Sequence, residues 1–444
     1  MFSVKTFSKT SLATLCALLY IAPLHAEPTS ESDAKSSAAS EDFSRRLESI
    51  DVEANSIKVE VKSDGLTDLT GFPASDRDYN IRRMQRESMH YSGGGFHIRY
   101  RKGEDGLDKL VETSIPVQMN FNVGVGRASF DVTPVFLSSG ELPNSEYVNR
   151  YYGTNSLFLP EDRKTNTSNS QGGVAFEVGY EVGGFGLKMG MTPVGFVQSN
   201  GTAELKFDHA FSGGFNFGIS TFREAITDSM LSYAGLEDEA SGLTWGAVTK
   251  NGGSLRLGYD AGGFGVYSEF VSAIYLGENI PDNDFFQFTG GIYFVPYKGD
   301  YLQLNGGFNV TYFEFEKNLR YFTYGQGGYF SPEQFYTASI PLSLSYTKDN
   351  ISLSLELTVG FQYFTEDESV FYPNDPDMQA ALEIFETEQP VTFDANSETK
   401  FANKIAVNLD YFLTEQFSAR AKLETQSAAD YEESIIALDV EYRF

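Results

Sequence analysis

Apolar and polar residues alternate along much of the chain from Gly93 onward. In residues 351–363 the odd positions, from Ile351 to Tyr363, are all apolar or aromatic, and most positions between them are polar. Side chains of a β-strand point alternately to its two faces, so the segment predicts a strand with one apolar and one polar face. Such segments run for about ten residues, the length that a tilted strand needs to cross a bilayer. The pattern predicts an all-β fold, a transmembrane antiparallel up-and-down β-barrel.

We predict about 16 strands. Their approximate bounds are 93–101, 112–122, 127–137, 172–181, 184–193, 202–210, 213–222, 245–260, 264–275, 286–296, 300–313, 334–346, 350–364, 399–413, 416–426 and 434–444. Every second connector is a tight turn, and the others include long loops over 138–171, 223–244, 314–333 and 365–398. Outer-membrane barrels have short periplasmic turns and long outer loops, and an even number of strands places both termini in the periplasm.

One segment affects the strand count. Asn251-Gly252-Gly253 has the composition of a hairpin turn, which would divide residues 245–260 and give an odd number of strands. We interpret it instead as a glycine bulge or as the start of one long strand.

The last strand ends the chain on Phe444. Leu438, Val440, Tyr442 and Phe444 fall on one face of it, and charged residues dominate the other face. The closing strand of a bacterial outer-membrane barrel commonly ends on an aromatic residue, which is part of the signal read by the barrel-assembly machinery. We therefore predict that these four residues form an assembly signal. The predicted location is the bacterial outer membrane, and the predicted partners are outer-membrane lipid and the barrel-assembly machinery.

The first residues have the features of an exported protein. Residues 1–26 combine Lys5 and Lys9, an apolar run over 12–22 and a small-residue cleavage site that ends at Ala26, which predicts a signal peptide. Residues 27–91 are predicted to be a largely flexible periplasmic leader, with a candidate strand over 57–61 and a candidate short helix over 76–89. The barrel is expected over 92–444.

Composition excludes several classes of protein. The only cysteine, Cys16, lies in the signal, so no disulfide framework is expected. The formal net charge is −28, and it becomes −30 without the signal, which carries two lysines and no acidic residue. Such a charge argues against nucleic acid as a partner and suits an acidic surface or an acidic, water-filled lumen. Composition alone leaves a secreted β-sandwich or propeller open.

No catalytic motif is recognised. His90, His97 and His209 have no Ser or Cys partner in a known arrangement, and no phosphate loop or dinucleotide fingerprint is present. We expect no enzymatic activity, no catalytic residue, no metal and no cofactor. Alternation places a set of charged residues in the lumen, where we expect most of them to pair across strands. They are Arg99, Arg101, Glu177, Glu181, Glu356, Asp410, Arg420, Lys422 and Glu424.

Two loops contain more than a strand pattern. The first loop covers residues 222–236 and continues at 244–248, and the second covers residues 317–335. Two shorter segments, 103–107 and 276–283, support the same resemblance. These segments resemble the C-terminal barrel domain of bacterial cellulose synthase operon protein C, the outer-membrane exporter of cellulose. The resemblance covers about residues 90–444. It implies a 16-stranded pore through which a β-1,4-glucan leaves the cell, supplied by an inner-membrane cellulose synthase. Family members also carry periplasmic tetratricopeptide repeats, and here we expect a separate periplasmic repeat protein to take that part.

A polysaccharide chain would find suitable side chains in these loops. Sugar rings stack on aromatic faces, so we predict polymer contacts from a group of loop aromatics. They are Tyr321, Phe322, Tyr324, Tyr329, Phe330, Tyr233 and Trp245. The alternative is that these rings pack the loops together or form an interface girdle. Gly325, Gly327 and Gly328 permit turns with positive φ or close approaches, and we consider a gating role for them.

The leading hypothesis is an outer-membrane channel that exports an exopolysaccharide, cellulose or a related β-glucan. The alternative is a general or substrate-selective diffusion porin. A third hypothesis is a structural or adhesive surface protein that acts through its long loops.

Overall fold

The structure, a computed structural model, describes residues 90–143, 145–165, 169–428 and 431–444. The predicted signal peptide, the leader, the candidate strand over 57–61 and the candidate helix over 76–89 lie outside the described residues.

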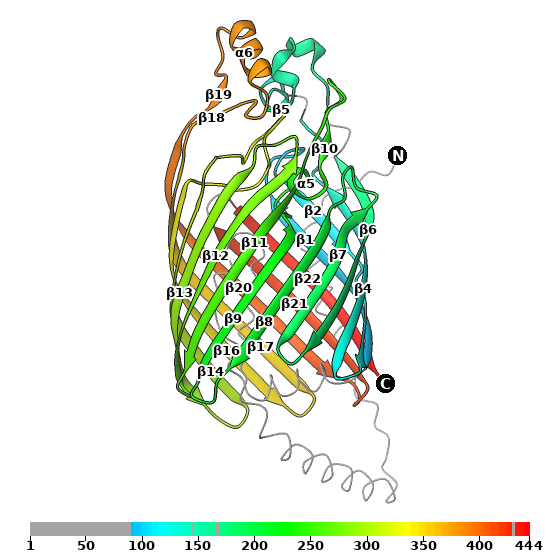
Figure 1. The fold of residues 1–444 in the computed structure, drawn as a ribbon, viewed down its shortest axis with the longest axis vertical. Coiled ribbons are helices and arrows are strands. Elements are labelled where there is room, and N and C mark those ends of the chain that lie inside the picture. Colours follow the sequence, from blue (N-terminus) through cyan, green and yellow to red (C-terminus); the bar gives the residue numbers. More distant parts are fainter. Residues whose placement is uncertain (1–89, 144, 166–168, 429–430) are drawn as a thin grey trace, which may run out of the picture. The chain divides into compact units, whose positions relative to one another are not determined.

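The described residues form a closed antiparallel barrel of 16 wall strands, as predicted (Figure 1). Each wall strand pairs with the next one along the chain, and the last strand pairs with the first from Tyr91↔Arg443 to Lys102↔Glu432. In order, the wall contains β1 (Tyr91–Lys102), β2 (Leu110–Ser114) with β3 (Val117–Val123), β4 (Gly126–Ser138), β6 (Ser170–Val182), β7 (Phe185–Val194), β8 (Gly201–Ala210), β9 (Phe215–Ala225), β11 (Thr244–Asp260), β12 (Phe264–Glu278), β13 (Asn283–Lys298), β14 (Leu302–Phe315), β16 (Gln334–Lys348), β17 (Ile351–Glu366), β20 (Asn396–Phe412), β21 (Phe417–Ala428) and β22 (Tyr431–Arg443).

The second wall strand is interrupted, although one strand was predicted over 112–122. β2 and β3 share the same register with β1, since His97 lies opposite Ser114 and Gly94 opposite Val117. The break falls at Pro116, which has no N–H to donate to the ladder. The carbonyl of Pro116 still accepts a hydrogen bond from the Gly95 amide at 3.0 Å. β2 and β3 are therefore one wall strand that proline divides.

The segment with Gly252 and Gly253 lies within one long strand, β11, as one of the two interpretations had it. Both glycines stay in register with β9 and β12. A Cβ atom on Gly252 would lie 2.2 Å from the carbonyl oxygen of Ser272, so this position needs a residue without a side chain. The irregularity in this strand comes earlier, between Gly246 and Thr249.

The two faces of the wall differ in chemistry. Large apolar residues are exposed on the outer face, for example Phe96 on β1, Phe361 on β17 and Leu438 on β22. The inner face, called the lumen face below, carries the polar and charged residues between them, such as His97 and Asp439, which contact each other at 2.8 Å. Within the described residues, no helix combines the length and the apolar character that crossing a membrane requires.

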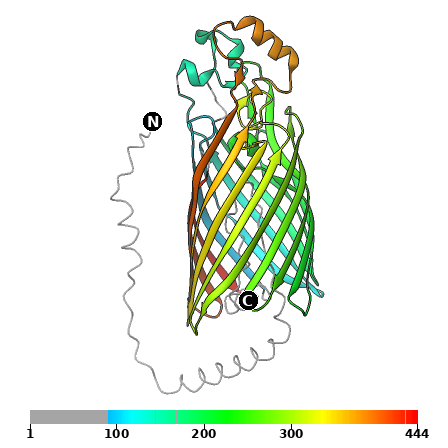
Figure 2. The same cartoon turned by 90° about the vertical axis from the view of Figure 1, so that its left-hand side faces the viewer.

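The two ends of the barrel are unlike. Tight turns and Phe444 lie at the lower end in Figure 1, called the turn end, and the strands are tilted as they rise from it (Figure 2). The long connectors gather at the opposite end, called the loop end. They contain short elements: α4 (Glu146–Asn149), β5 (Tyr152–Gly153), η1 (Asn155–Leu157), η2 (Pro160–Asp162), α5 (Met230–Ala234), β10 (Leu236–Glu237), β15 (Phe322–Thr323), β18 (Ser369–Val370), α6 (Pro376–Phe385) and β19 (Thr392–Phe393).

Candidate functional site

The loop between β9 and β11 crosses the mouth of the barrel. Thr227 in this loop accepts two hydrogen bonds from the Arg99 guanidinium, at 3.1 Å to its hydroxyl and 2.8 Å to its carbonyl oxygen. Arg99 projects from the lumen face of β1, where Glu112 and Glu433 hold it at 2.8 and 3.6 Å. β1 is the first wall strand and β9 the seventh, so the two stand on far sides of the wall. The loop therefore spans the lumen.

The crossing loop contains a short helix with defined ends. Ser229 caps α5 and forms a capping box with Ser232, in which each side chain bonds to the backbone of the other. Gly235 follows the helix at a φ of 71°, which favours glycine. Met230 and Leu231 are buried, so the helix is fixed by packing as well as by its caps.

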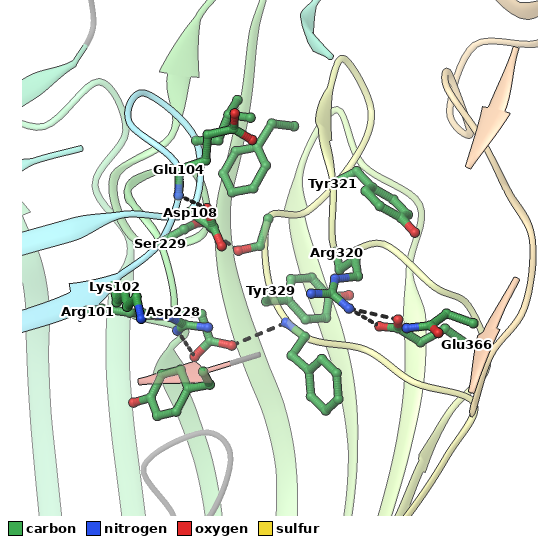
Figure 3. Close-up of a pocket in the computed structure, with 16 residues that line it drawn as sticks. Arg101, Lys102, Glu104, Asp108, Asp228, Ser229, Arg320, Tyr321, Tyr329 and Glu366 are labelled. Carbon is green, nitrogen blue, oxygen red and sulfur yellow. Dashed lines mark hydrogen bonds and ion pairs between the residues drawn. The ribbon is translucent and has the colours of Figure 1, made fainter. Parts of the chain in front are cut away.

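The loop between β14 and β16 meets the crossing loop over the lumen (Figure 3). The Asp228 carboxylate accepts a hydrogen bond from the Phe330 amide at 3.3 Å, and the Ser229 hydroxyl donates one to the Gly328 carbonyl at 2.7 Å. Asp228 also lies 3.7 Å from Arg101 on β1. We call residues 226–243 and 316–333 together the mouth plug. The three contacts tie both halves of the plug to each other and to the wall.

The predicted polymer-contact residues lie in or beside the mouth plug. Trp245, at the loop end of β11, is fully buried between the rings of Tyr152 and Tyr324, with centroids at 5.7 and 6.0 Å. Tyr329 stacks on Tyr275 of β12 at 5.1 Å, and Phe330 meets Phe364 of β17 at 5.2 Å. These contacts join the plug to the lumen face of the wall.

The remaining aromatic residues of that group differ from one another in burial. Phe322 lies in β15 and is buried, whereas Tyr233 and Tyr321 are half-buried. Tyr233 makes an edge contact with Phe196 at 5.3 Å, and Tyr321 stacks on Phe393 at 3.5 Å. In this arrangement the rings pack the loops together. Contact with a polymer stays a prediction. Tyr321, Phe322, Tyr329 and Phe330 all line one cavity, and Tyr321 is the only one of these four rings that is not buried.

That cavity has a volume of about 360 Å³ and lies between the mouth plug and the wall. Two of its arginines are held by other residues of the lining. Arg320 donates to both carboxylate oxygens of Glu366, at 2.9 and 2.7 Å, and the Arg101 guanidinium lies 4.2 Å from the centre of the Tyr431 ring. Figure 3 shows Arg320 with Glu366 on one side and Arg101 with Asp228 on the other. The cavity is thus bordered by the ion pairs that hold the plug.

Burial affects the ionisable groups of the plug. It raises the pKa of the Tyr329 phenol and of the Tyr321 phenol above the usual value, and it also raises the pKa of Glu333, which accepts a hydrogen bond from the Asp367 amide at 2.7 Å. The phenols of the plug therefore stay neutral, and they act as hydrogen-bonding and stacking groups.

The glycines of the loop between β14 and β16 have either a positive φ or a close contact with a neighbour, as the sequence indicated. Gly325 and Gly328 have φ of 92° and 66°. Gly327 has no positive φ, but a Cβ atom there would lie 2.3 Å from the Tyr329 ring. The loop needs glycine at these positions, either for its backbone or for its packing. Gating itself is not tested by this geometry.

The predicted lumen charges all belong to wall strands, and several of them form ion pairs with neighbouring strands. Glu177 contacts Lys188, Glu181 contacts Arg127 and Lys206, Asp410 contacts Arg420, and Glu424 contacts Lys422 and Lys404, at distances from 2.9 to 3.3 Å. Glu356 lies on β17 between the outward residues Leu355 and Leu357, in register with Ser343. Arg99 and Arg101 are distinct, because their contacts reach the mouth plug.

Sequence reasoning missed the residues that join the two loops to each other and to the wall. Asp228, Ser229 and Arg320 stood within the quoted loop segments, but no local pattern distinguished them from their neighbours. Their partners lie 46 to 102 positions away in the chain. Only the closure of the barrel brings these residues together.

The predicted assembly signal lies on the outer face at the turn end. Leu438, Val440, Tyr442 and Phe444 are all exposed there. The Phe444 amide donates a hydrogen bond to the His90 carbonyl at 3.1 Å, so the last residue joins the first described one. Its role in assembly stays a prediction.

Comparisons with known proteins agree on one family. Residues 108–444 match the family model described as "Cellulose synthase operon protein C C-terminus". The "Cellulose synthase operon protein C" of Pseudomonas fluorescens (strain SBW25) is 30% identical over 78% of this chain and 26% of its own length. That of Komagataeibacter xylinus is 31% identical over 64% of this chain and 23% of its own length. The chain thus spans about a quarter of the length of these relatives.

A solved structure described as "Bacterial polysaccharide outer membrane secretin" shares the fold. It is 9% identical, has a TM-score of 0.51, and matches over 81% of this chain and 99% of its own. A closed barrel with an apolar outer face and long loops at one end is the architecture of bacterial outer-membrane proteins, and the chain is an outer-membrane barrel. By its sequence over most of its length, the chain belongs to the family of the cellulose synthase operon protein C C-terminus.

Proposed function

We propose that the chain is an outer-membrane channel through which an exopolysaccharide, cellulose or a related β-glucan, leaves the cell. The observation that carries the proposal is the mouth plug, in which Asp228 and Ser229 of one loop hold Gly328 and Phe330 of the other across the lumen. Where a polymer is made only at certain times, a wide pore that is closed when no polymer is present keeps the outer membrane sealed. The names of the relatives support cellulose as the polymer.

The proposed mechanism is passive. The polymer enters from the turn end, pushed by its synthesis at an inner-membrane cellulose synthase, and a separate periplasmic repeat protein guides it to the barrel. Hydroxyl-rich sugars exchange hydrogen bonds with water and with the polar lumen face, so no chemical step is needed for passage. The channel is proposed to be non-enzymatic.

The plug is proposed to act as the gate. Opening requires the hydrogen bonds from Ser229 and Phe330 to break, while the glycines Gly325, Gly327 and Gly328 give the second loop the freedom to swing. Once it has moved, Tyr321 and Tyr329 are released from their present ring contacts to stack on the emerging sugars.

Deletion of the gene and complementation test the proposal. We expect a deletion strain to lose surface cellulose, as read by cellulose staining, and the wild-type gene to restore it. A variant without Phe444 retains every plug and lumen residue but is expected to assemble poorly, so it should restore less surface cellulose than the wild-type gene. Unchanged staining in the deletion strain would count against export, and a large, steadily open pore without polymer would favour the diffusion porin.

A further inference from the structure

The lumen face differs from one side of the barrel to the other. From β20 through β1 to β12 it carries ion pairs, such as Arg420 with Asp410 and Arg256 with Asp208. Over β13, β14, β16 and β17 amides and hydroxyls predominate instead. They are Gln287, Thr289, Gln303, Asn305, Asn309, Thr311, Thr337, Ser339, Ser343, Thr358 and Gln362.

Four of these residues form one patch, which we call the polar quartet: Asn309, Ser339, Thr358 and Gln362. Asn309 on β14 lies opposite Ser339 on β16, and Ser339 lies opposite Gly360 on β17. Thr358 and Gln362 flank Gly360 two positions to either side, on the same face of β17. The quartet is thus contiguous across three neighbouring strands.

The polar atoms of the quartet are buried and without partners in the described part of the chain. Asn309 is 0% exposed, and Ser339, Thr358 and Gln362 are each 1% exposed. Both amide atoms of Asn309 and of Gln362, and the hydroxyls of Ser339 and Thr358, make no hydrogen bond to any residue that the structure describes. Buried polar atoms are nearly always hydrogen-bonded in proteins, so a cluster of such atoms is unusual.

Neighbouring residues of the same chemistry do find partners. Thr289 bonds to Thr311 at 3.2 Å, Gln303 to Asn305 at 2.9 Å, and Asn305 to Ser343 at 2.9 Å. The unpaired atoms are therefore a property of the quartet and not of the whole polar side of the lumen.

The quartet lies just below the mouth plug. Further toward the loop end on the same three strands, the lumen face carries Phe313, Phe335 and Phe364. These rings are buried, and Phe330 of the plug packs against Phe335 and Phe364. On β14 and β16 only Thr311 and Thr337 stand between the quartet and these rings on the lumen face, so the quartet lies close beneath the closed mouth.

We propose that the polar quartet is a binding subsite for the hydroxyl groups of a neutral glycan on its way to the mouth. Amides and hydroxyls can both donate and accept hydrogen bonds, as sugar hydroxyls do, and they carry no charge that would favour an ion over a sugar. In the closed barrel these side chains are covered, so they turn toward the lumen when a glycan arrives, and the hydrogen bonds that they then make to its hydroxyls replace their unpaired burial. The inference rests on the proposed export of a glucan and names where the chain is held.

Binding of cellopentaose to the full-length purified barrel, measured by calorimetry, tests the subsite. We compare wild type with Asn309→Leu combined with Gln362→Met, and with Ser339→Ala combined with Thr358→Val. The control is Ser345→Ala combined with Ser354→Ala, a register pair of the same strands nearer the turn end. We expect each quartet variant to bind roughly tenfold more weakly, and the control to bind like wild type.

Folding and function are separated by two further measurements. Because the replaced atoms have no partner, we expect the quartet variants to keep the heat stability of the wild-type barrel. Equal affinity of wild type and both quartet variants, or an equal loss in the control, overturns the subsite. If that happens while the wild-type gene still restores surface cellulose, export stands and only the subsite fails. If the gene restores no cellulose, the proposed function fails.

Discussion

Gly328 allows the loop between β14 and β16 to pack directly against the crossing loop. Its φ of 66° is in the left-handed region, and a Cβ atom there would lie 2.8 Å from the Ser229 hydroxyl oxygen and 2.9 Å from Leu231. Both neighbours belong to the crossing loop. The absence of a side chain at 328 therefore allows the hydrogen bond from Ser229 to the Gly328 carbonyl.

Gly328→Ala is expected to loosen the mouth plug. The left-handed backbone costs alanine about 1 kcal/mol, and the clash with the crossing loop adds about 1–3 kcal/mol. We expect the probability of the open channel in planar bilayers to rise at least tenfold.

Gly242→Ala is the matched control for this variant. Gly242 has a φ of 71°, but a Cβ atom there would meet nothing within 4 Å. It therefore carries the backbone strain without the clash. Equal open probabilities in the two variants would show that the contact between the loops does not close the channel.

The wall strands were predictable because their signal is local. Alternation with a period of two identifies each strand and its outward face without knowledge of its neighbours. The long strand β11 was found in this way despite its paired glycines. The break at Pro116 was missed, because a proline that leaves the register intact does not disturb the alternation.

The plug was predictable only in part. The resemblance indicated which loops matter, and glycine composition indicated that one of them turns tightly. The pairing of Asp228 with Phe330 depends on the order of strands around the barrel, and no local pattern contains it. The unpaired atoms of the polar quartet could not be predicted either, since burial depends on the whole wall.

The closing strand gives a prediction for membrane assembly. Deletion of Phe444 removes an exposed ring and the hydrogen bond from its amide to His90. We expect less heat-modifiable barrel in the outer membrane, with unchanged conductance in the molecules that do assemble.

Phe417→Ala serves as the control for that deletion. Phe417 is another exposed aromatic of the outer face at the turn end, on the neighbouring strand β21. A comparable fall in assembled barrel in both variants would assign the effect to lost apolar surface. Normal assembly without Phe444 would contradict the predicted signal.

The whole molecule is a closed wall with a plugged mouth and an excess of acidic residues. We expect wild type to show low, brief conductance, and Asp228→Ala to show long open events, because the change removes the acceptor of the Phe330 amide and the partner of Arg101. With a net charge of −28, the opened channel should prefer cations in a salt gradient.

Asp282→Asn is the control for that substitution. The Asp282 side chain is exposed, and the hydrogen bond from Lys317 reaches its backbone carbonyl instead. It should keep the low conductance of wild type. Long open events in wild type, or an anion preference after opening, would contradict this description of the pore.

Trp245 gives the closed mouth an optical reporter. It is the only tryptophan in the chain, it is 0% exposed, and it lies between Tyr152 of one loop and Tyr324 of another. Separation of those loops would bring water to the indole and shift its fluorescence emission to longer wavelength. Intrinsic emission can thus follow opening in the unlabelled wild-type protein, and an unshifted spectrum from Asp228→Ala would mean that these loops stay together when the channel conducts.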